Sequence, residues 1–189
     1  VGRNTAPAIA FAALNSNPND NLLILPADHS INNISKFHKV IKEATSLLSK
    51  ELLVTFGVIP TEPHIGYGYI QKGKSIDSGF NVASFTEKPD LDQANVFLES
   101  GEYLWNSGMF LFKASKYLEE LRQFEPKIFD SCLMAYEKRT NDNNFIRPDR
   151  ESFLSSPSNS IDYAIMEKTE NSVVMPLDVD WSDLGSWES

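Results

Sequence analysis

Two aspartates are the first residues of this sequence that could do chemistry together. Asp28 directly follows a short apolar run, and Asp183 lies in a tryptophan-flanked loop that contains a glycine. Two carboxylates that meet at the rim of a sheet can hold a magnesium ion, because Mg²⁺ takes hard oxygen ligands and keeps waters and substrate phosphates in its shell. An aspartate after a strand is also a common turn or cap residue, and spacing alone does not pair the two.

Glu87 and Lys88 place a carboxylate beside an ammonium group just before Pro89, which ends a strand-like run. Adjacent side chains of a strand point to opposite faces, so both could reach one ligand only where the strand ends and the chain turns. The alternative is a solvated ion pair, which contributes little to stability. The residue types alone favour that alternative.

Two glycine-containing segments could bind a polar ligand such as a sugar. Segment 105–108 presents the amide of Asn106 before an apolar run, and an amide suits sugar hydroxyls because it both donates and accepts hydrogen bonds. In segment 66–70, Gly68 follows Tyr67 and would let a ligand approach the backbone closely. The alternatives are an ordinary turn at 105–108 and a bulge or bend at 66–70.

Composition argues against several other classes of function. The 189 residues carry a formal net charge of -9, which disfavours a general nucleic-acid surface, and no apolar run approaches the roughly 18 residues that cross a bilayer. The single cysteine, Cys132, is expected to be an inert, partly buried helix residue. The sequence has no zinc-hydrolase histidine pair, serine-nucleophile elbow or phosphate-binding glycine loop. We expect a soluble, cytoplasmic protein with no nucleic-acid or membrane partner.

The elements that must position these residues alternate between helix and strand patterns. Three- and four-residue apolar steps predict helices at 5–14, 37–48, 91–99, 115–124, 126–138 and 161–168. Short apolar runs predict strands at 22–25, 52–59, 66–70, 82–85, 109–112 and 173–175. Consecutive apolar positions at 22–25 are typical of a strand buried on both faces, and the polar stretches 140–148 and 155–160 are expected to be loops. The pattern favours one α/β domain with ligands at the carboxyl ends of its strands, where Asp28 lies.

Taken in order, seven segments resemble the successive motifs of bacterial mannose-1-phosphate guanylyltransferases, a branch of the sugar nucleotidyltransferase family. The segments are GRNTAPAIA, LPADH, GYGYI, FTEKP, WNSGMFLF, SIDYAIMEK and DWSDLGSW. The resemblance covers essentially the whole chain, and its first and fifth segments are similar to the mannose and GTP branch rather than to the glucose branches. It implies a Rossmann-like α/β fold with a mixed, mainly parallel sheet flanked by helices, of which residues 1–189 form a partial catalytic domain.

The resemblance also implies a metal site and a guanine pocket. Asp28 and Asp183 match the metal-binding aspartates of the family, with Mg²⁺ as the expected ion. Segment 3–8 matches the lining of the guanine pocket, where Asn4 and Thr5 would read the edge of the base.

A sugar-phosphate subsite follows from the same resemblance. Gly68 matches a backbone contact to the sugar, Glu87 an acceptor for a sugar hydroxyl, and Asn106 a further sugar contact. Lys88 matches the cation on the phosphate of the sugar, whereas Trp181 is expected only to shape the last loop.

The implied reaction joins GTP and mannose 1-phosphate to form GDP-mannose. A phosphate oxygen of mannose 1-phosphate attacks the α-phosphorus of GTP, and pyrophosphate leaves. Because both reactants are anions, Mg²⁺ and cationic side chains would supply charge neutralisation and alignment. Lys88, Asp28 and Asp183 are the catalytic candidates in this chain.

The sequence departs from the family pattern at its start. Family members begin with a strand and a glycine-rich loop that carries a G-T-R element, followed by a proline-lysine pair, and none of these lies in this chain. We therefore expect these 189 residues alone to be inactive. A sheet without its first strand would expose an edge, which favours self-association into a homo-oligomer.

Three alternative functions stay open at this point. The first is a regulatory homologue that binds a sugar nucleotide without catalysis. The second is a nucleotidyltransferase for another hexose 1-phosphate or another nucleotide. The third is a structural domain in which the motifs form only turns.

Overall fold

The computed structural model describes residues 2–185, so Ser186 and Trp187 of the last motif lie outside the described residues. The chain divides into two compact units, residues 1–22 with 113–169 and residues 23–112 with 170–189. Each unit is built from segments that are distant in the sequence. They are described separately below.

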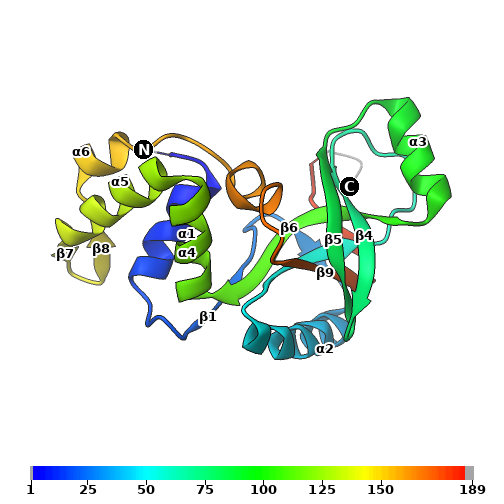
Figure 1. Cartoon of the computed structure of the whole chain (residues 1–189), viewed down its shortest axis with the longest axis horizontal. Coiled ribbons are helices and arrows are strands. Elements are labelled where there is room, and N and C mark those ends of the chain that lie inside the picture. The colour runs from blue at the N-terminus through cyan, green and yellow to red at the C-terminus, as the bar shows by residue number, and fades with distance from the viewer. Residues whose placement is uncertain (1, 186–189) are drawn as a thin grey trace. The chain divides into compact units, whose positions relative to one another are not determined.

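The first unit is mainly helical. Its elements are α1 (Thr5–Leu14), α4 (Ala114–Phe124), α5 (Pro126–Glu137), α6 (Arg150–Leu154), a π-helical turn (Asp162–Met166) and the hairpin strands β7 (Thr140–Asp142) and β8 (Phe145–Arg147). Figure 1 shows α1 beside α4, and the buried hydroxyl of Tyr117 on α4 donates to the carbonyl of Ala6 on α1 at 2.8 Å. The predicted helices of this unit are confirmed. The loop expected at 140–148 is wrong, because residues on either side of a short turn pair as β7 and β8.

Cys132 is fully buried on α5, where its thiol lies 3.8 Å from the carbonyl oxygen of Pro7. Burial raises the pKa of this thiol to about 11, although a hydrogen bond with Ser156 opposes the shift. A thiolate is therefore scarce at neutral pH, and the cysteine is fully buried rather than partly buried as expected.

The second unit carries most of the sheet. Its strands are β2 (Ser30–Ile31), β3 (Leu53–Val58), β4 (Gly68–Ile76), β5 (Gly79–Glu87), β6 (Tyr103–Lys113), β9 (Ser172–Leu177) and β10 (Trp181–Ser182), and β1 (Asn21–Ile24) lies at the unit boundary. Its helices are α2 (Ile34–Thr45), which continues into a 3-10 helix (Ser46–Lys50), and α3 (Leu91–Ser100). The main sheet has the order β1-β6-β3-β9-β5-β4, with a further pairing of β6 with β4.

Strand directions in this sheet are mixed. β3 and β9 run parallel, whereas β6 is antiparallel to β3 and β4, and β5 is antiparallel to β9 and β4. The mixed sheet with flanking helices is confirmed, but the expectation of mainly parallel pairing is wrong for these described strands. The physical reason is local, because β4 and β5 are joined by a two-residue turn and hairpin neighbours are antiparallel.

Burial along the strands follows their place in the sheet. All six residues of β3 are buried, as expected for a central strand whose two faces are both covered. The expectation that strand 22–25 is buried on both faces is wrong, because β1 lies at the end of the sheet order and its residues alternate between exposed and half-buried. Leu23 is 37% exposed, so a consecutive apolar run does not by itself define a central strand.

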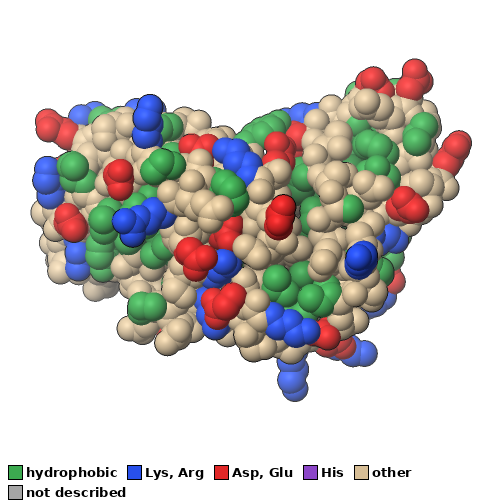
Figure 2. Space-filling view, viewed as in Figure 1, with side chains coloured by type: hydrophobic (Ala, Val, Ile, Leu, Met, Phe, Trp, Pro, Cys, Tyr) green, Lys and Arg blue, Asp and Glu red, His purple; other side chains and the backbone are tan. Residues whose placement is uncertain are grey.

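Surface charge is dispersed on the face shown in Figure 2. Acidic and basic side chains alternate there, and no continuous basic area covers the described residues of that face. Among residues 2–185, no helix is both long enough and apolar enough to span a bilayer.

Gly57 gives a test of how closely the strands approach. A Cβ atom at Gly57 on β3 would lie 2.6 Å from Cβ of Leu104 and 2.8 Å from Cγ2 of Val174. We expect Gly57→Ala to lower the free energy of unfolding by about 1 to 3 kcal/mol, because these buried neighbours must move. Urea titration measures the change, with Ser75→Ala at an exposed position of β4 as the control. Equal stability of the two variants would contradict the packing described for β3.

Candidate functional site

Three of the predicted sugar-site residues form one row across β5, β4 and β6. Gly68 pairs with Glu87, and the neighbouring Tyr69 pairs with Trp105, so Asn106 continues the row on the third strand. A Cβ atom at Gly68 would lie 2.6 Å from Oε2 of Glu87 and 3.3 Å from Cβ of Asn106. Glycine at this position therefore leaves the space that the Glu87 carboxylate occupies. We call Gly68, Glu87 and Asn106 the polar row.

A bulge in β6 sets the position of Asn106. Thr55 pairs with Phe110 but Gly57 pairs with Asn106, so β6 has two extra residues at this point. Gly108 takes the left-handed conformation with φ of 68°, and the amide oxygen of Asn106 accepts a hydrogen bond from its N–H at 3.1 Å. Segment 105–108 is therefore a bulge within a long strand, which corrects the expectation of a turn before a strand.

Lys88 lies where β5 ends, beside the polar row. Its Nζ is 3.8 Å from Oε1 of Glu87, and its side chain is 67% exposed whereas that of Glu87 is 21% exposed. The backbone turns sharply here, because Lys88 has a φ of 49° and its N–H donates to the carbonyl of Tyr67 at 3.3 Å. The turn allows the consecutive side chains of Glu87 and Lys88 to lie at one end of the sheet. This is the condition under which both could reach one ligand.

A short antiparallel ladder places the segments that carry the two aspartates side by side. Trp181 pairs with Ile31 and Ser182 pairs with Ser30, so β10 and β2 run in opposite directions. Asp183 follows Ser182 and Asp28 precedes Ser30 by two residues, hence both carboxylates leave the same end of the ladder. The chain reaches β10 from the carboxyl end of β9, next to the carboxyl end of its parallel neighbour β3.

An aromatic cluster joins this ladder to the polar row. The ring of Tyr67, the residue before Gly68, stacks on His64 at 3.8 Å and meets Trp105 and Trp181 edge-on at 5.1 and 5.4 Å. Trp105 is buried, and its indole N–H has no hydrogen-bond partner among the described residues. We use the term aromatic cluster for Tyr67, His64, Trp105 and Trp181.

Hydrogen bonds tie the cluster to both aspartate segments. The hydroxyl of Tyr67 donates to Oδ1 of Asp183 at 2.9 Å, and Nε1 of Trp181 donates to Nδ1 of His29 at 3.2 Å. On its other side, Nε2 of His29 lies 3.8 Å from Oδ1 of Asp28, a side chain that is 85% exposed. Burial, followed by the bond to Asp183, raises the pKa of Tyr67 to about 12, so the hydroxyl stays a neutral donor.

Asn4 and Thr5 belong to the first unit, where both have structural roles. The side chain of Asn4 caps α1 by accepting from the N–H of Thr5 at 2.8 Å, and its φ of 67° is left-handed. The hydroxyl oxygen of Thr5 accepts from the N–H of Ile161 at 2.9 Å. Both residues are exposed, so their predicted contact with a base stays a prediction.

The donor set at the ladder fits a magnesium ion better than a transition metal. Asp28 and Asp183 offer carboxylate oxygens, which Mg²⁺ prefers, and the exposed side chain of Asp28 leaves room for water and phosphate oxygens. Residues 2–185 contain no group of three or more His, Cys, Asp or Glu side chains arranged around one point, so a metal caged by protein side chains alone is not formed there. Such an ion would share its shell with a substrate.

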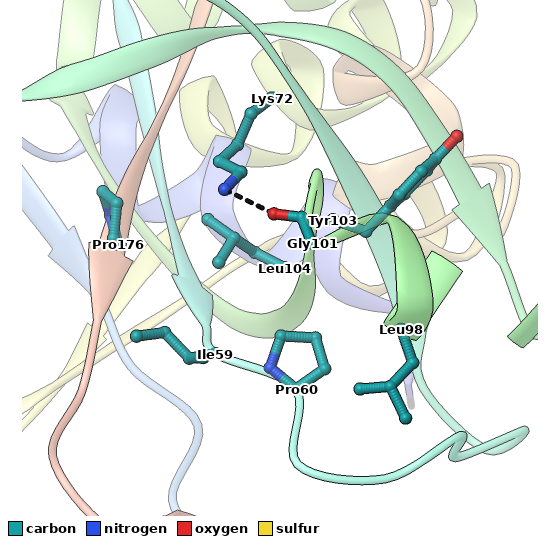
Figure 3. A pocket seen from close by; sticks show the side chains of 8 residues that line it. All are labelled: Ile59, Pro60, Lys72, Leu98, Gly101, Tyr103, Leu104 and Pro176. Carbon is teal, nitrogen blue, oxygen red and sulfur yellow. Dashed lines mark hydrogen bonds between the residues drawn. The ribbon is translucent and has the colours of Figure 1, made fainter. Parts of the chain in front are cut away.

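A cavity of about 180 Å³ lies apart from the predicted site residues. It is lined by Ile59, Pro60, Lys72, Leu98, Gly101, Tyr103, Leu104 and Pro176. Figure 3 shows the Lys72 ammonium group donating to the carbonyl of Gly101, at 2.8 Å, within an otherwise mostly apolar lining. No residue predicted to bind substrate or metal lines this cavity. This cavity is therefore mostly apolar and lacks the polar groups of the polar row.

The chain has the fold of the nucleotidyl transferases. The sequence matches the family model described as nucleotidyl transferase over residues 1–189, and the chain belongs to this family. The xanthan biosynthesis protein XanB of Xanthomonas campestris pv. campestris (strain B100) is 53% identical over 191 residues, which cover 100% of this chain and 41% of that protein. The mannose-1-phosphate guanylyltransferase of Salmonella montevideo is 50% identical over 197 residues, which cover 100% of this chain and 42% of that enzyme.

A solved structure agrees with the sequence matches. The mannose-6-phosphate isomerase from Helicobacter pylori superposes with a TM-score of 0.88 at 36% identity, covering 96% of this chain and 71% of that one. The resemblance read from the seven segments is confirmed at the level of the family and its fold. This chain spans about two fifths of the length of the two relatives named above.

Sequence reasoning missed the residues that support the carboxylates. Tyr67 was noted only as the neighbour of a glycine, Trp181 only as a loop-shaping residue, and His29 not at all as a partner of Trp181. The usable signal was positional, because each lies within two residues of a predicted site residue. Aromatic residues with a polar tip pack on one side and donate a hydrogen bond on the other.

The raised pKa of Tyr67 can be tested by titration. With a pKa of about 12, roughly a tenth of this hydroxyl is ionised at pH 11. We expect Asp183→Asn to lower the pKa, since it removes the adjacent negative charge, although burial should keep it above its ordinary value of 10.0. Site-resolved ¹³C NMR of the tyrosine ring measures the ionised fraction, and Asp180→Asn in the same loop is the control. A titration unaffected by Asp183→Asn would contradict the hydrogen bond.

Proposed function

We propose that the protein containing this chain is a mannose-1-phosphate guanylyltransferase, which forms GDP-mannose and pyrophosphate from GTP and mannose 1-phosphate in the cytoplasm. The observation that carries the proposal is the meeting of the polar row with two aspartate segments at one end of the sheet, through the bond from Tyr67 to Asp183. The substrates are proposed from the 50% identity to the Salmonella montevideo enzyme over the whole chain.

The polar row would bind the sugar. The Glu87 carboxylate can accept from two sugar hydroxyls, while the Asn106 amide can both donate and accept. Gly68 would contribute its backbone to the sugar subsite, because its missing side chain lets the Glu87 carboxylate lie directly against that backbone. The Trp105 N–H is a further donor in this region, since it has no partner among the described residues.

Lys88 would bind the phosphate of mannose 1-phosphate. Its exposed ammonium lies 3.8 Å from the Glu87 carboxylate, which places a cation beside the sugar acceptor. A sugar held by Glu87 would therefore present its phosphate near Lys88. Fixing that phosphate aligns the attacking oxygen, which is the main contribution a side chain can make when both reactants are preassembled.

Asp28 and Asp183 would hold Mg²⁺ with the substrate phosphates. The ion would neutralise charge on the phosphates and on the departing pyrophosphate. The attacking phosphate oxygen forms a bond to the α-phosphorus of GTP while the bond from that phosphorus to the β-phosphate oxygen breaks. Asn4 and Thr5 are proposed to contact guanine, because their backbone and side-chain polar groups are exposed at the start of α1.

Pyrophosphate release by the full-length protein tests the substrate assignment. GTP, UTP and dTTP are each supplied with mannose 1-phosphate and with glucose 1-phosphate in the presence of Mg²⁺. We expect GTP with mannose 1-phosphate to have the highest kcat/KM of these pairs. Preference for UTP with glucose 1-phosphate would contradict the assignment. Binding of GDP-mannose without turnover of any pair would indicate a regulatory protein.

The role of Lys88 predicts a selective loss. We expect Lys88→Ala to raise the KM for mannose 1-phosphate by about ten- to a hundredfold, because hydrogen bonds to a charged group contribute roughly 1.5 to 3 kcal/mol. The KM for GTP should change little. Steady-state kinetics of the full-length protein measure both constants, with Lys74→Ala, an exposed lysine on β4, as the control. A change confined to the KM for GTP would remove Lys88 from the sugar-phosphate subsite.

A further inference from the structure

Tyr67 and Trp181 pack against each other while each is bonded to a different aspartate segment. Their rings meet edge-on with centroids 5.4 Å apart and an interplanar angle of 65°. Tyr67 comes from the chain that enters β4, and Trp181 belongs to β10. A displacement of either ring would therefore move groups on both sides of the contact.

The hydrogen bond from Tyr67 fixes one carboxylate oxygen of Asp183. We call this hydrogen bond the Tyr67 arm. Oδ1 of Asp183 accepts from the Tyr67 hydroxyl at 2.9 Å and from the backbone N–H of Gly185 at 3.1 Å. Both bonds fall on the same oxygen, so neither occupies Oδ2. Two donors from different segments restrict rotation of the carboxylate, because turning it would break both bonds.

The hydrogen bond from Trp181 to His29, which we call the Trp181 arm, determines which nitrogen of His29 carries the proton. Nε1 of Trp181 is always a donor, so Nδ1 of His29, 3.2 Å away, must be the acceptor. In the neutral ring the proton is then on Nε2, the atom that lies 3.8 Å from Oδ1 of Asp28. The rings of His29 and Trp181 also meet edge-on at 5.2 Å, which holds the imidazole in place.

We propose that Tyr67 is a positioning residue for Asp183, and that Trp181 holds the imidazole of His29 in place beside Asp28. The inference rests on the proposed metal role of the two aspartates. Through the Tyr67–Trp181 contact, the Asp183 carboxylate is held relative to the His29 imidazole before an ion binds. The backbone of Tyr67 also accepts from the N–H of Lys88 at 3.3 Å, which connects the same support to the sugar-phosphate subsite.

Binding of Mn²⁺ alone to the full-length protein tests the Tyr67 arm without requiring turnover. Tyr67→Phe keeps the ring contacts and removes only the hydroxyl. We expect it to weaken Mn²⁺ binding by about tenfold, measured by water-proton relaxation, as is typical when a partner of a metal ligand is lost. Tyr69→Phe is the matched control, because that hydroxyl, two residues along the chain on β4, donates to the carbonyl of His64 at 3.0 Å and not to a carboxylate.

Steady-state kinetics distinguish a positioning role of Tyr67 from a general loss of folded protein. We expect Tyr67→Phe to lower kcat and to raise the Mg²⁺ concentration needed for half-maximal rate, with the KM for mannose 1-phosphate unchanged. Trp181→Phe removes the donor to His29 and should weaken Mn²⁺ binding in the same direction, and it carries the test if Tyr67→Phe does not fold. Thermal unfolding midpoints of all three variants report their folding.

The outcomes distinguish this inference from the proposed function. Equal Mn²⁺ affinity of wild type and folded Tyr67→Phe overturns the positioning role, whatever the transfer assays give. If wild type binds Mn²⁺ about tenfold more tightly than Tyr67→Phe but transfers no guanylyl group, the positioning role is supported and only the proposed function is overturned. A wild-type protein that binds no Mn²⁺ overturns both the positioning role and the metal role of the aspartates.

Discussion

The site depends on the parallel pairing of β9 with β3. Val58 pairs with Leu177 at the last position of both strands, so the chain leaves β9 at the edge where β3 ends. Segment 178–183 can then return beside β2, and this path is what carries Asp183 to Tyr67. The pairing is held by burial, because all of β3 and nearly all of β9 are shielded from water. The position of a catalytic candidate near the end of the described chain is thus set by apolar residues of two strands distant in the sequence.

A steric constraint determines the other half of the site. At Gly68 three strands come so close that an added methyl group would clash with the Glu87 carboxylate. The Glu87 carboxylate therefore lies directly against the backbone of Gly68. The two extra residues of β6 shift its register against β3 without changing the alternation of side chains, and the pairing of β6 with β4 places Asn106 in the same row. Close approach and bulge are backbone features. They explain why side chains that are ordinary when taken singly can form a polar row.

The sequence predicted this arrangement unevenly, for physical reasons. Helices such as α1 and α5 were predicted nearly to the residue, since proline and capping residues mark where they begin. Strand partners depend on contacts between distant segments, so the antiparallel pairing of β9 with β5 and the edge position of β1 could not be read from apolar runs. The residues of the polar row were identified through family motifs, whereas their shared row requires the register. The bond from Tyr67 to Asp183 joins segments that no local pattern relates.

Neutral donors suit the support of a carboxylate that must also attract a cation. A lysine in place of Tyr67 would fix Asp183 equally well, but its charge would cancel the field that draws in a metal ion. A hydroxyl whose pKa is about 12 donates one hydrogen bond and leaves the full negative charge on the carboxylate. The indole of Trp181 and a neutral His29 act on the Asp28 segment in the same way. Lys88, by contrast, lies beside Glu87 at the polar row, where a cation can meet the phosphate of the sugar. In the proposed site, neutral groups position a carboxylate while the cationic residue lies apart from it, so one end of the sheet would bind an ion and two anionic substrates together.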